Sequence, residues 1–242
     1  MDLLLKGAQA LRMDVESEHV KAFQIYYDEL LTWNQKFNLT AITEYENAQI
    51  RHFLDSLTCL LAMETESPLG QQSLIDVGTG AGFPGLVLKI VRPDIQLTLL
   101  DSTAKKTRFL KHLVQRLGLQ GVTVLHGRAE TLGQDPKHRE RYDWTVARAV
   151  AEMPILAEYL LPLTKIGGGA LAQKGEDAPA EVQRAEYAIA QFGGRIRKLM
   201  PVEMHGLAET RYLVLMDKVA ASPAKYPRRP GMPSKRPLLA ET

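Results

Sequence analysis

Apolar residues near the N-terminus recur at the spacing of amphipathic helices. After Ser17, a favoured helix-capping residue, they return every three or four positions along one side of a helix. Thr43 and Glu46 have the spacing of a capping box, and a second stretch of the same pattern follows to about Met63. The pattern predicts an N-terminal helical cap over residues 1–70.

From Ser73 onward, short apolar runs alternate with helical stretches. The expected strands are Leu74–Val77, Gln96–Leu100, Val122–Leu125, Tyr142–Ala147 and Gly169–Gln173. The expected helices between them are Pro84–Val91, Ala104–Leu117, Pro154–Leu161 and Ala178–Gln191. This alternation is typical of a parallel sheet covered by helices and predicts an α/β domain over residues 71–220. Two further strands, near Arg195–Glu203 and Arg211–Val219, lack a long helical connection, which predicts an antiparallel hairpin at one sheet edge.

The last segment of the chain differs in composition from the rest. Residues 220–237 contain five prolines, five bases and no acids. Such a composition favours an extended backbone and an anionic partner. We therefore expect residues 221–242 to form an extended, basic, proline-rich tail.

Composition and charge narrow the class of protein. The chain has 242 residues, of which 45% are apolar and 24% charged, as in one globular domain with appendages. Residues 1–70 carry 11 acids and 5 bases, so the net charge of +2 conceals a basic remainder of +8, which favours a partner such as nucleic acid. Cys59 is the only cysteine, and the histidines form no close pair, so neither an intramolecular disulfide nor a metal site is expected. Without a membrane-length apolar run or a signal-peptide pattern, a cytoplasmic protein is expected.

Glycines and an acid indicate a ligand at the strand ends. Gly78, Gly80 and Gly82 follow the first short apolar run, where the missing Cβ lets the backbone pass close to a ligand. Pro84 suits the first turn of the following helix. Asp101 ends the next expected strand, where a carboxylate can accept hydrogen bonds from both hydroxyls of a ribose.

The glycine pattern alone does not select the ligand, because it also fits a nicotinamide or flavin oxidoreductase. Asp76, within the first strand, suits a cationic ligand with an amino group and a sulfonium better than a pyrophosphate. The C-terminal hairpin favours the class I methyltransferase plan over a dehydrogenase. A cofactor-sensing RNA-binding module without catalysis is the other alternative.

Five motifs in order along the chain carry a resemblance to a known family. They are Trp33–Thr40, His52–Leu57, Asp76–Gly85, Arg148–Val150 and Gln173–Gly175. Together they resemble the RsmG family, also called glucose-inhibited division protein B, from about Tyr26 to Leu238. The resemblance implies a Rossmann-like, seven-stranded class I methyltransferase that depends on S-adenosylmethionine. It further implies methylation of N7 of guanine 527, in the 530 loop of 16S ribosomal RNA, on the free RNA or on the small ribosomal subunit. A monomer is expected.

The residues present fit this acceptor better than other methyl acceptors. Guanine N7 has a free lone pair, so no general base has to remove a proton before attack. Methylation at pyrimidine C5 usually needs a cysteine nucleophile near the later strands, whereas Cys59 lies upstream of the glycines. Exocyclic amine methyltransferases usually carry an Asn/Asp-Pro-Pro-aromatic motif, where this chain has Ala147–Glu152. An endocyclic nitrogen is the methyl acceptor that remains.

Candidate site residues follow from the resemblance and from the expected strand ends. The expected cofactor contacts are Gly78, Gly80, Phe83, Asp101, Ser102, Thr103, Ala129, Glu130 and Arg148. Because positioning is expected to suffice for catalysis, the candidates beside the methyl group are Arg148, His52 and Asn38. The expected RNA contacts are Lys105, Lys106, Lys174, Arg228, Arg229, Lys235 and Arg236.

Overall fold

Strands from the whole second part of the chain form one mixed sheet. The computed structural model describes residues 1–64, 69–204 and 206–240. Within them the seven strands lie in the order β3-β2-β1-β4-β5-β7-β6. Their bounds are β1 Ser73–Val77, β2 Gln96–Asp101, β3 Val122–His126, β4 Tyr142–Arg148, β5 Thr164–Lys174, β6 Gly194–Val202 and β7 Arg211–Lys218. Strands β1 to β5 pair in parallel, whereas β7 is antiparallel to both β5 and β6, so the predicted hairpin at one edge is confirmed.

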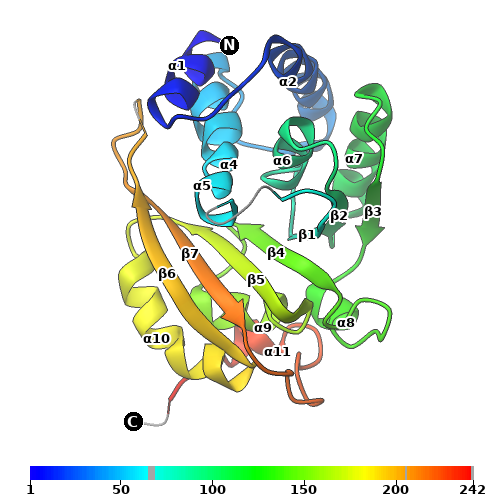
Figure 1. Cartoon of the computed structure of the whole chain (residues 1–242). Helices are drawn as coiled ribbons and strands as arrows, with labels where there is room; N and C mark the ends of the chain where they lie inside the picture. The colour runs from blue at the N-terminus through cyan, green and yellow to red at the C-terminus, as the bar shows by residue number, and fades with distance from the viewer. Residues whose placement is uncertain (65–68, 205, 241–242) are drawn as a thin grey trace.

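Helices cover both faces of this sheet. On one face α6 (Gly85–Val91) and α7 (Ala104–Arg116) pack with the N-terminal helices, at the top of Figure 1. On the other face lie α8 (Ala129–Leu132), α9 (Met153–Leu160) and α10 (Ala178–Gln191). Adjacent residues of β1 therefore enter different cores: Leu74 joins the first and Ile75 the second, because side chains alternate along a strand. None of the described helices is long and apolar enough to cross a membrane.

The N-terminal helices differ in detail from those predicted. They are α1 Asp2–Ala10, α2 Ser17–Phe37, α3 Tyr45–Ala48, the π-helical η1 Gln49–Leu54, α4 Asp55–Leu57 and α5 Cys59–Met63. Glu16 rather than Ser17 caps α2, and Glu44 rather than Thr43 caps α3 by accepting from the Asn47 amide. The π-helical turn η1 lies where the helical cap contacts the sheet, since Arg148 of β4 donates to the Arg51 carbonyl of η1. π-helical turns occur frequently at functional sites.

The expectation of an extended C-terminal tail is wrong for the described residues up to 240. The segment folds back over the α8–α9 face and ends in a short helix, α11 (Met232–Lys235). The Arg139 guanidinium donates to the carbonyl oxygens of Ser222 (2.6 Å) and Tyr226 (2.6 Å), and the Tyr226 ring packs edge-on against Phe192. Arginine and aromatic anchors on the domain therefore override the proline-rich composition. Residues 65–68 of the predicted cap and 241–242 of the predicted tail lie outside the described residues.

Candidate active site

The loop after β1 makes a tight turn that favours glycine. Gly78 and Gly80 adopt positive φ angles of 70° and 64°. The Gly78 amide donates to the Leu100 carbonyl of β2 at 2.8 Å. A Cβ on Gly78 would lie 2.7 Å from Cγ2 of Val150, which follows β4. At Gly78 the loop thus passes between the ends of β2 and β4 where no side chain would fit.

Asp76 braces this loop from inside the protein. Its Oδ2 accepts from Thr79 Oγ1 (2.6 Å) and from the Gly85 amide (2.8 Å), and the side chain is fully buried. Burial raises the pKa of this carboxyl to about 6. Asp76 does not line the cavity at the strand ends. The interpretation that it favours a cationic ligand is therefore not supported by contact, and its observed role is to hold the loop.

A cavity of about 170 Å³ lies where the parallel strands end, and we call it the strand-end cavity. It is lined by Val77, Gly78, Leu100, Asp101, Ser102, Gly127, Arg128, Ala129, Glu130, Val150, Ala151, Tyr159 and Ser234. Asp101 accepts from the Gly80 amide at Oδ2 (3.0 Å) and from the Thr103 amide at Oδ1 (2.8 Å). Because each carboxylate oxygen has two acceptor positions, Asp101 can still accept from a ribose.

The structure brings some of the predicted cofactor residues into this cavity and leaves others out. Gly78, Asp101, Ser102, Ala129 and Glu130 line it. Gly80, Phe83, Thr103 and Arg148 lie outside its lining, and Thr103 occupies the N-cap position of α7.

Among the lining residues of the strand-end cavity that sequence reasoning did not single out, two carry hydroxyl groups. Tyr159 of α9 and Ser234 of α11 both line it, and their hydroxyl oxygens lie 3.1 Å apart. Neither belongs to a motif, and only the folded C-terminal segment brings Ser234 to the site.

Phe83 joins the helical cap to the sheet rather than to the strand-end cavity. Its buried ring is nearly parallel to the rings of Tyr26 (centroids 5.0 Å apart) and His52 (4.4 Å). The Arg148 guanidinium carbon lies 5.0 Å from the Phe83 centroid, within the range of a cation–π contact. The Tyr26 hydroxyl donates to the Ala81 carbonyl at 2.7 Å. These contacts hold His52 and Arg148 next to the glycine loop.

A second cavity, of about 340 Å³, lies between the helical cap and the ends of β4, β5 and β7, and we call it the cap–sheet cavity. It is lined by Ile42, Arg51, His52, Asp55, Arg148, Ala149, Gln173, Lys174, Gly175, Asp177, Glu181 and Arg211. Arg148 Nη1 donates to Asp55 Oδ2 (2.9 Å) and to the Arg51 carbonyl (3.1 Å).

The two cavities are neighbours along the chain after β4. Arg148 and Ala149 line the cap–sheet cavity, and Val150 and Ala151 line the strand-end cavity. Ala149 has a positive φ of 55°, a conformation that is uncommon for residues other than glycine and that often marks functional sites. Asn38 lines neither cavity: it is exposed and ends α2 in the left-handed conformation.

His52 lies in the wall of the cap–sheet cavity and is neutral at physiological pH. Burial, followed by the charge of Arg148, lowers the pKa of His52 to about 4. Between pH 6.5 and 4 the unfolded chain binds a proton here that the folded protein does not, so the free energy of unfolding falls as pH falls.

His52→Gln removes this titration. Urea unfolding at a series of pH values should show wild type losing roughly 3 kcal/mol more than the variant over this window. An equal fall in the free energy of unfolding with pH in the two proteins would contradict the buried, neutral state of His52.

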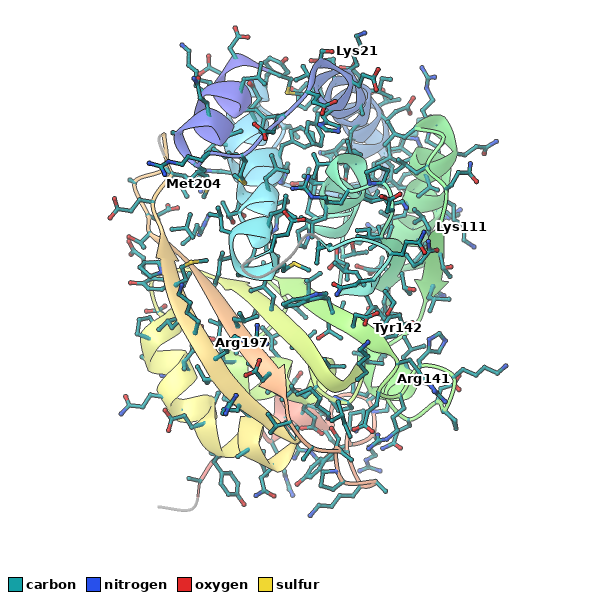
Figure 2. All side chains as sticks on the ribbon, viewed as in Figure 1. Lys21, Lys111, Arg141, Tyr142, Arg197 and Met204 are labelled. Carbon is teal, nitrogen blue, oxygen red and sulfur yellow. The ribbon has the colours of Figure 1, made fainter. Side chains whose placement is uncertain are left out.

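The predicted RNA-binding bases fall into two groups. Three are held by acids: Lys106 lies 3.9 Å from Asp101 Oδ2, Lys174 lies 2.7 Å from Glu181, and Arg228 pairs with the buried Glu158. The others, Lys105, Arg229, Lys235 and Arg236, have no ion-pair partner among the described residues. Figure 2 shows another base of α7, Lys111, at the outer edge of the molecule.

The fold and these cavities define a class of enzyme. A doubly wound parallel sheet binds ligands outside the carboxyl ends of its strands. Here that edge carries a glycine loop after β1, a buried acid at the end of β2, and an antiparallel pair formed by β7 with β5. This combination is that of a class I S-adenosylmethionine-dependent methyltransferase.

The comparisons place the chain within this class. Residues 19–206 match the family model GidB, described as rRNA small subunit methyltransferase G, and the chain belongs to this family. Ribosomal RNA small subunit methyltransferase G of Roseiflexus sp. (strain RS-1) is 49% identical over 98% of this chain and 100% of its own length. The protein of the same name from Dehalococcoides mccartyi (strain BAV1) is 47% identical, covering 99% and 100%. Membership of this family removes the oxidoreductase alternative.

Two solved structures share the fold with this chain. TrmN from Thermus thermophilus matches with a TM-score of 0.51 and 19% identity, over 69% of this chain and 48% of TrmN. MtNAS, solved in complex with MTA and tNA, matches with a TM-score of 0.57 and 12% identity, over 81% of this chain and 71% of MtNAS. At these identities the likeness concerns the fold alone.

Proposed function

We propose that this protein transfers a methyl group from S-adenosylmethionine to N7 of guanine 527 in the 530 loop of 16S ribosomal RNA. Membership of the family supports the reaction class and the RNA substrate. The structural observation that carries the proposal is the pair of neighbouring cavities on either side of residues 148–151. One provides a cofactor site at the strand ends, and the other provides room for an acceptor beside it.

The residues of the strand-end cavity fit the cofactor. Gly78 offers a backbone surface without a side chain, and the buried Asp101 offers carboxylate oxygens for the ribose hydroxyls. Ala129 and Glu130, at the start of α8, are proposed to contact the adenine. When bound, S-adenosylmethionine supplies an electrophilic methyl group on a sulfonium.

The protein acts in this reaction mainly by positioning. Guanine N7 attacks with its own lone pair, so no side chain has to remove a proton. Holding the acceptor atom about 3–3.5 Å from the methyl group and in line with it removes much of the entropic barrier. Arg148 is fixed by Asp55 and by the cap backbone, and it stands at the boundary between the two cavities. The neutral His52 beside it adds no charge to repel the developing cation.

Bases without an ion-pair partner among the described residues supply the proposed contacts with the RNA backbone. Arg229, Lys235 and Arg236 lie on the C-terminal segment, and Lys105 lies at the start of α7. We propose that the protein acts as a monomer. A ribosomal RNA substrate supports a cytoplasmic location.

Transfer of labelled methyl groups tests the proposal. The protein is incubated with labelled S-adenosylmethionine and with either free 16S ribosomal RNA or small ribosomal subunits, and the RNA is then cleaved at N7-methylguanine. We expect label at guanine 527 on at least one substrate, and none when guanine 527 is replaced by adenine. Label at another nucleotide would show that guanine 527 is not the methyl acceptor. No label on either substrate, with the cofactor bound, would favour the non-catalytic RNA-binding alternative.

A further inference from the structure

The cap–sheet cavity contains an unusual concentration of buried polar atoms without partners. Among the described residues, five buried side-chain nitrogen or oxygen atoms have no hydrogen-bond partner. One is Asp76 Oδ1, beneath the glycine loop. The other four are His52 Nδ1, Asp55 Oδ1, Gln173 Oε1 and Arg211 Nε, and all four residues line this one cavity. Because folded proteins satisfy most buried polar groups, such a cluster indicates that a polar ligand completes the site.

Three of the four unpartnered atoms, those of Asp55, Gln173 and Arg211, have fixed chemical roles. Gln173 Nε2 donates to the Asp55 carbonyl (2.6 Å) and to Thr58 Oγ1 (3.1 Å), so its amide is oriented with Oε1 as a free acceptor. Arg148 holds Asp55 Oδ2 at 2.9 Å, which leaves Oδ1 as a second acceptor. Arg211 Nε lies 3.7 Å from that Oδ1, close enough for attraction but too far for a hydrogen bond. The cavity therefore combines two acceptors with one cationic donor.

This set complements one edge of one base. The Watson–Crick edge of guanine presents two donors, N1–H and the N2 amino group, next to the acceptor O6. Adenine places an acceptor, N1, where guanine has a donor, so it would leave one of the protein acceptors unpaired. A base held by its Watson–Crick edge has N7 on its other side, free of the protein contacts that would block attack.

We propose that the cap–sheet cavity binds the target guanine and that two acceptors select it: Asp55 Oδ1, next to Arg211, accepts from N1–H, and Gln173 Oε1 accepts from the N2 amino group. The proposal rests on the proposed function, because it assigns the acceptor side of the same reaction. Arg211 faces O6 in this arrangement. Gln173 and Asp55 are then specificity-determining residues that lie next to each other but come from different parts of the fold, the sheet and the helical cap. Base flipping into such a pocket is common among enzymes that modify bases.

A cycle of two changes, one in the protein and one in the RNA, tests this assignment. Small subunits are reconstituted with guanine or inosine at position 527; inosine lacks the N2 amino group but keeps N7. With wild type, we expect kcat/KM to be about 10- to 100-fold lower for inosine. With Gln173→Ala, we expect a comparable loss on guanine and a guanine-to-inosine ratio within about threefold of one, because the two changes remove the same contact.

A second variant separates recognition from anchoring. Thr58→Val removes a hydrogen bond that holds the Gln173 amide but leaves Oε1 in place, so it should keep the wild-type preference for guanine. The affinity of each variant for S-adenosylhomocysteine should match wild type, because neither residue lines the strand-end cavity. Equal wild-type rates on guanine and inosine, or an equal loss of preference in Thr58→Val, would overturn this inference and leave the proposed function intact. Absence of transfer to guanine itself would overturn both.

Discussion

Asp101→Asn is expected to weaken binding of S-adenosylhomocysteine by about a hundred-fold in isothermal titration calorimetry. Hydrogen bonds to a charged acceptor contribute roughly 1.5–3 kcal/mol each, and the variant loses the charge that receives the ribose hydroxyls. The carboxylate also accepts from the Gly80 and Thr103 amides, so its loss loosens the glycine loop as well. Both effects act in the same direction on affinity.

Asp94→Asn is the matched control for this variant. Asp94 is an exposed acid just before β2, at the opposite end of the same strand, so it changes the net charge equally without touching the strand-end cavity. We expect wild-type affinity from it. Thermal unfolding of both variants checks that the fold is kept. Wild-type affinity in Asp101→Asn would rule out the proposed contact with the ribose.

Arg228→Ala is expected to lower the free energy of unfolding by roughly 3 kcal/mol, measured by urea denaturation. Arg228 donates through Nε and Nη2 to both oxygens of Glu158, with distances of 2.6–3.1 Å, and the Glu158 side chain is fully buried. Removing one partner of a buried ion pair leaves the other charge uncompensated, which typically costs about 3–5 kcal/mol. The backbone amide of Arg228 continues to donate to Glu158 in the variant, which places the expected value at the lower end.

The neighbouring Arg229 provides the comparison. It is exposed, so Arg229→Ala should change stability by less than about 0.5 kcal/mol. It should instead weaken RNA binding and reduce the dependence of that binding on salt, because one phosphate contact is lost. If Arg228→Ala unfolds like wild type and loses RNA affinity instead, Arg228 is an RNA contact and not an anchor of the C-terminal segment.

Local patterns predicted the sheet well because each strand carries its signal in its own residues. Apolar runs, glycines and helical spacing located every strand from β1 to β7, and most ends agree within two residues. The exception is β5, which starts at Thr164 instead of Gly169. A register shift opposite Tyr142 and Trp144 lets the glycine-rich stretch pair with β4, and no local pattern reveals such a bulge.

Features that depend on distant partners could not be predicted. Helix α1 was missed because it has no local side-chain cap; the Leu3 and Leu4 amides donate instead to Gln49 Oε1, 45 or more positions away. The folded C-terminal segment was missed for the same reason, since its anchors Arg139 and Glu158 lie in other elements.

The candidate site was predicted in part. The glycine loop, Asp101 and the start of α8 were located by their positions at strand ends. Of the cap–sheet cavity, only His52, Arg148 and Lys174 were singled out as site residues. Asp55 and Gln173 lie in motifs that carried the resemblance, but the cavity walls come from six separate elements, which no local pattern brings together.

The folded C-terminal segment couples two equilibria, its own docking on the domain and the occupation of the strand-end cavity. The Gly231 amide donates to Glu130 Oε1 at 2.8 Å, and Ser234 contributes to the wall of the strand-end cavity. Docking of this segment and occupation of that cavity therefore share the same residues. Since thermodynamic coupling is reciprocal, any free energy by which bound cofactor favours the docked segment equals the free energy by which docking favours the cofactor. RNA engaging Arg229, Lys235 or Arg236 on this segment would thus act on cofactor affinity from outside the cavity, without touching the cofactor.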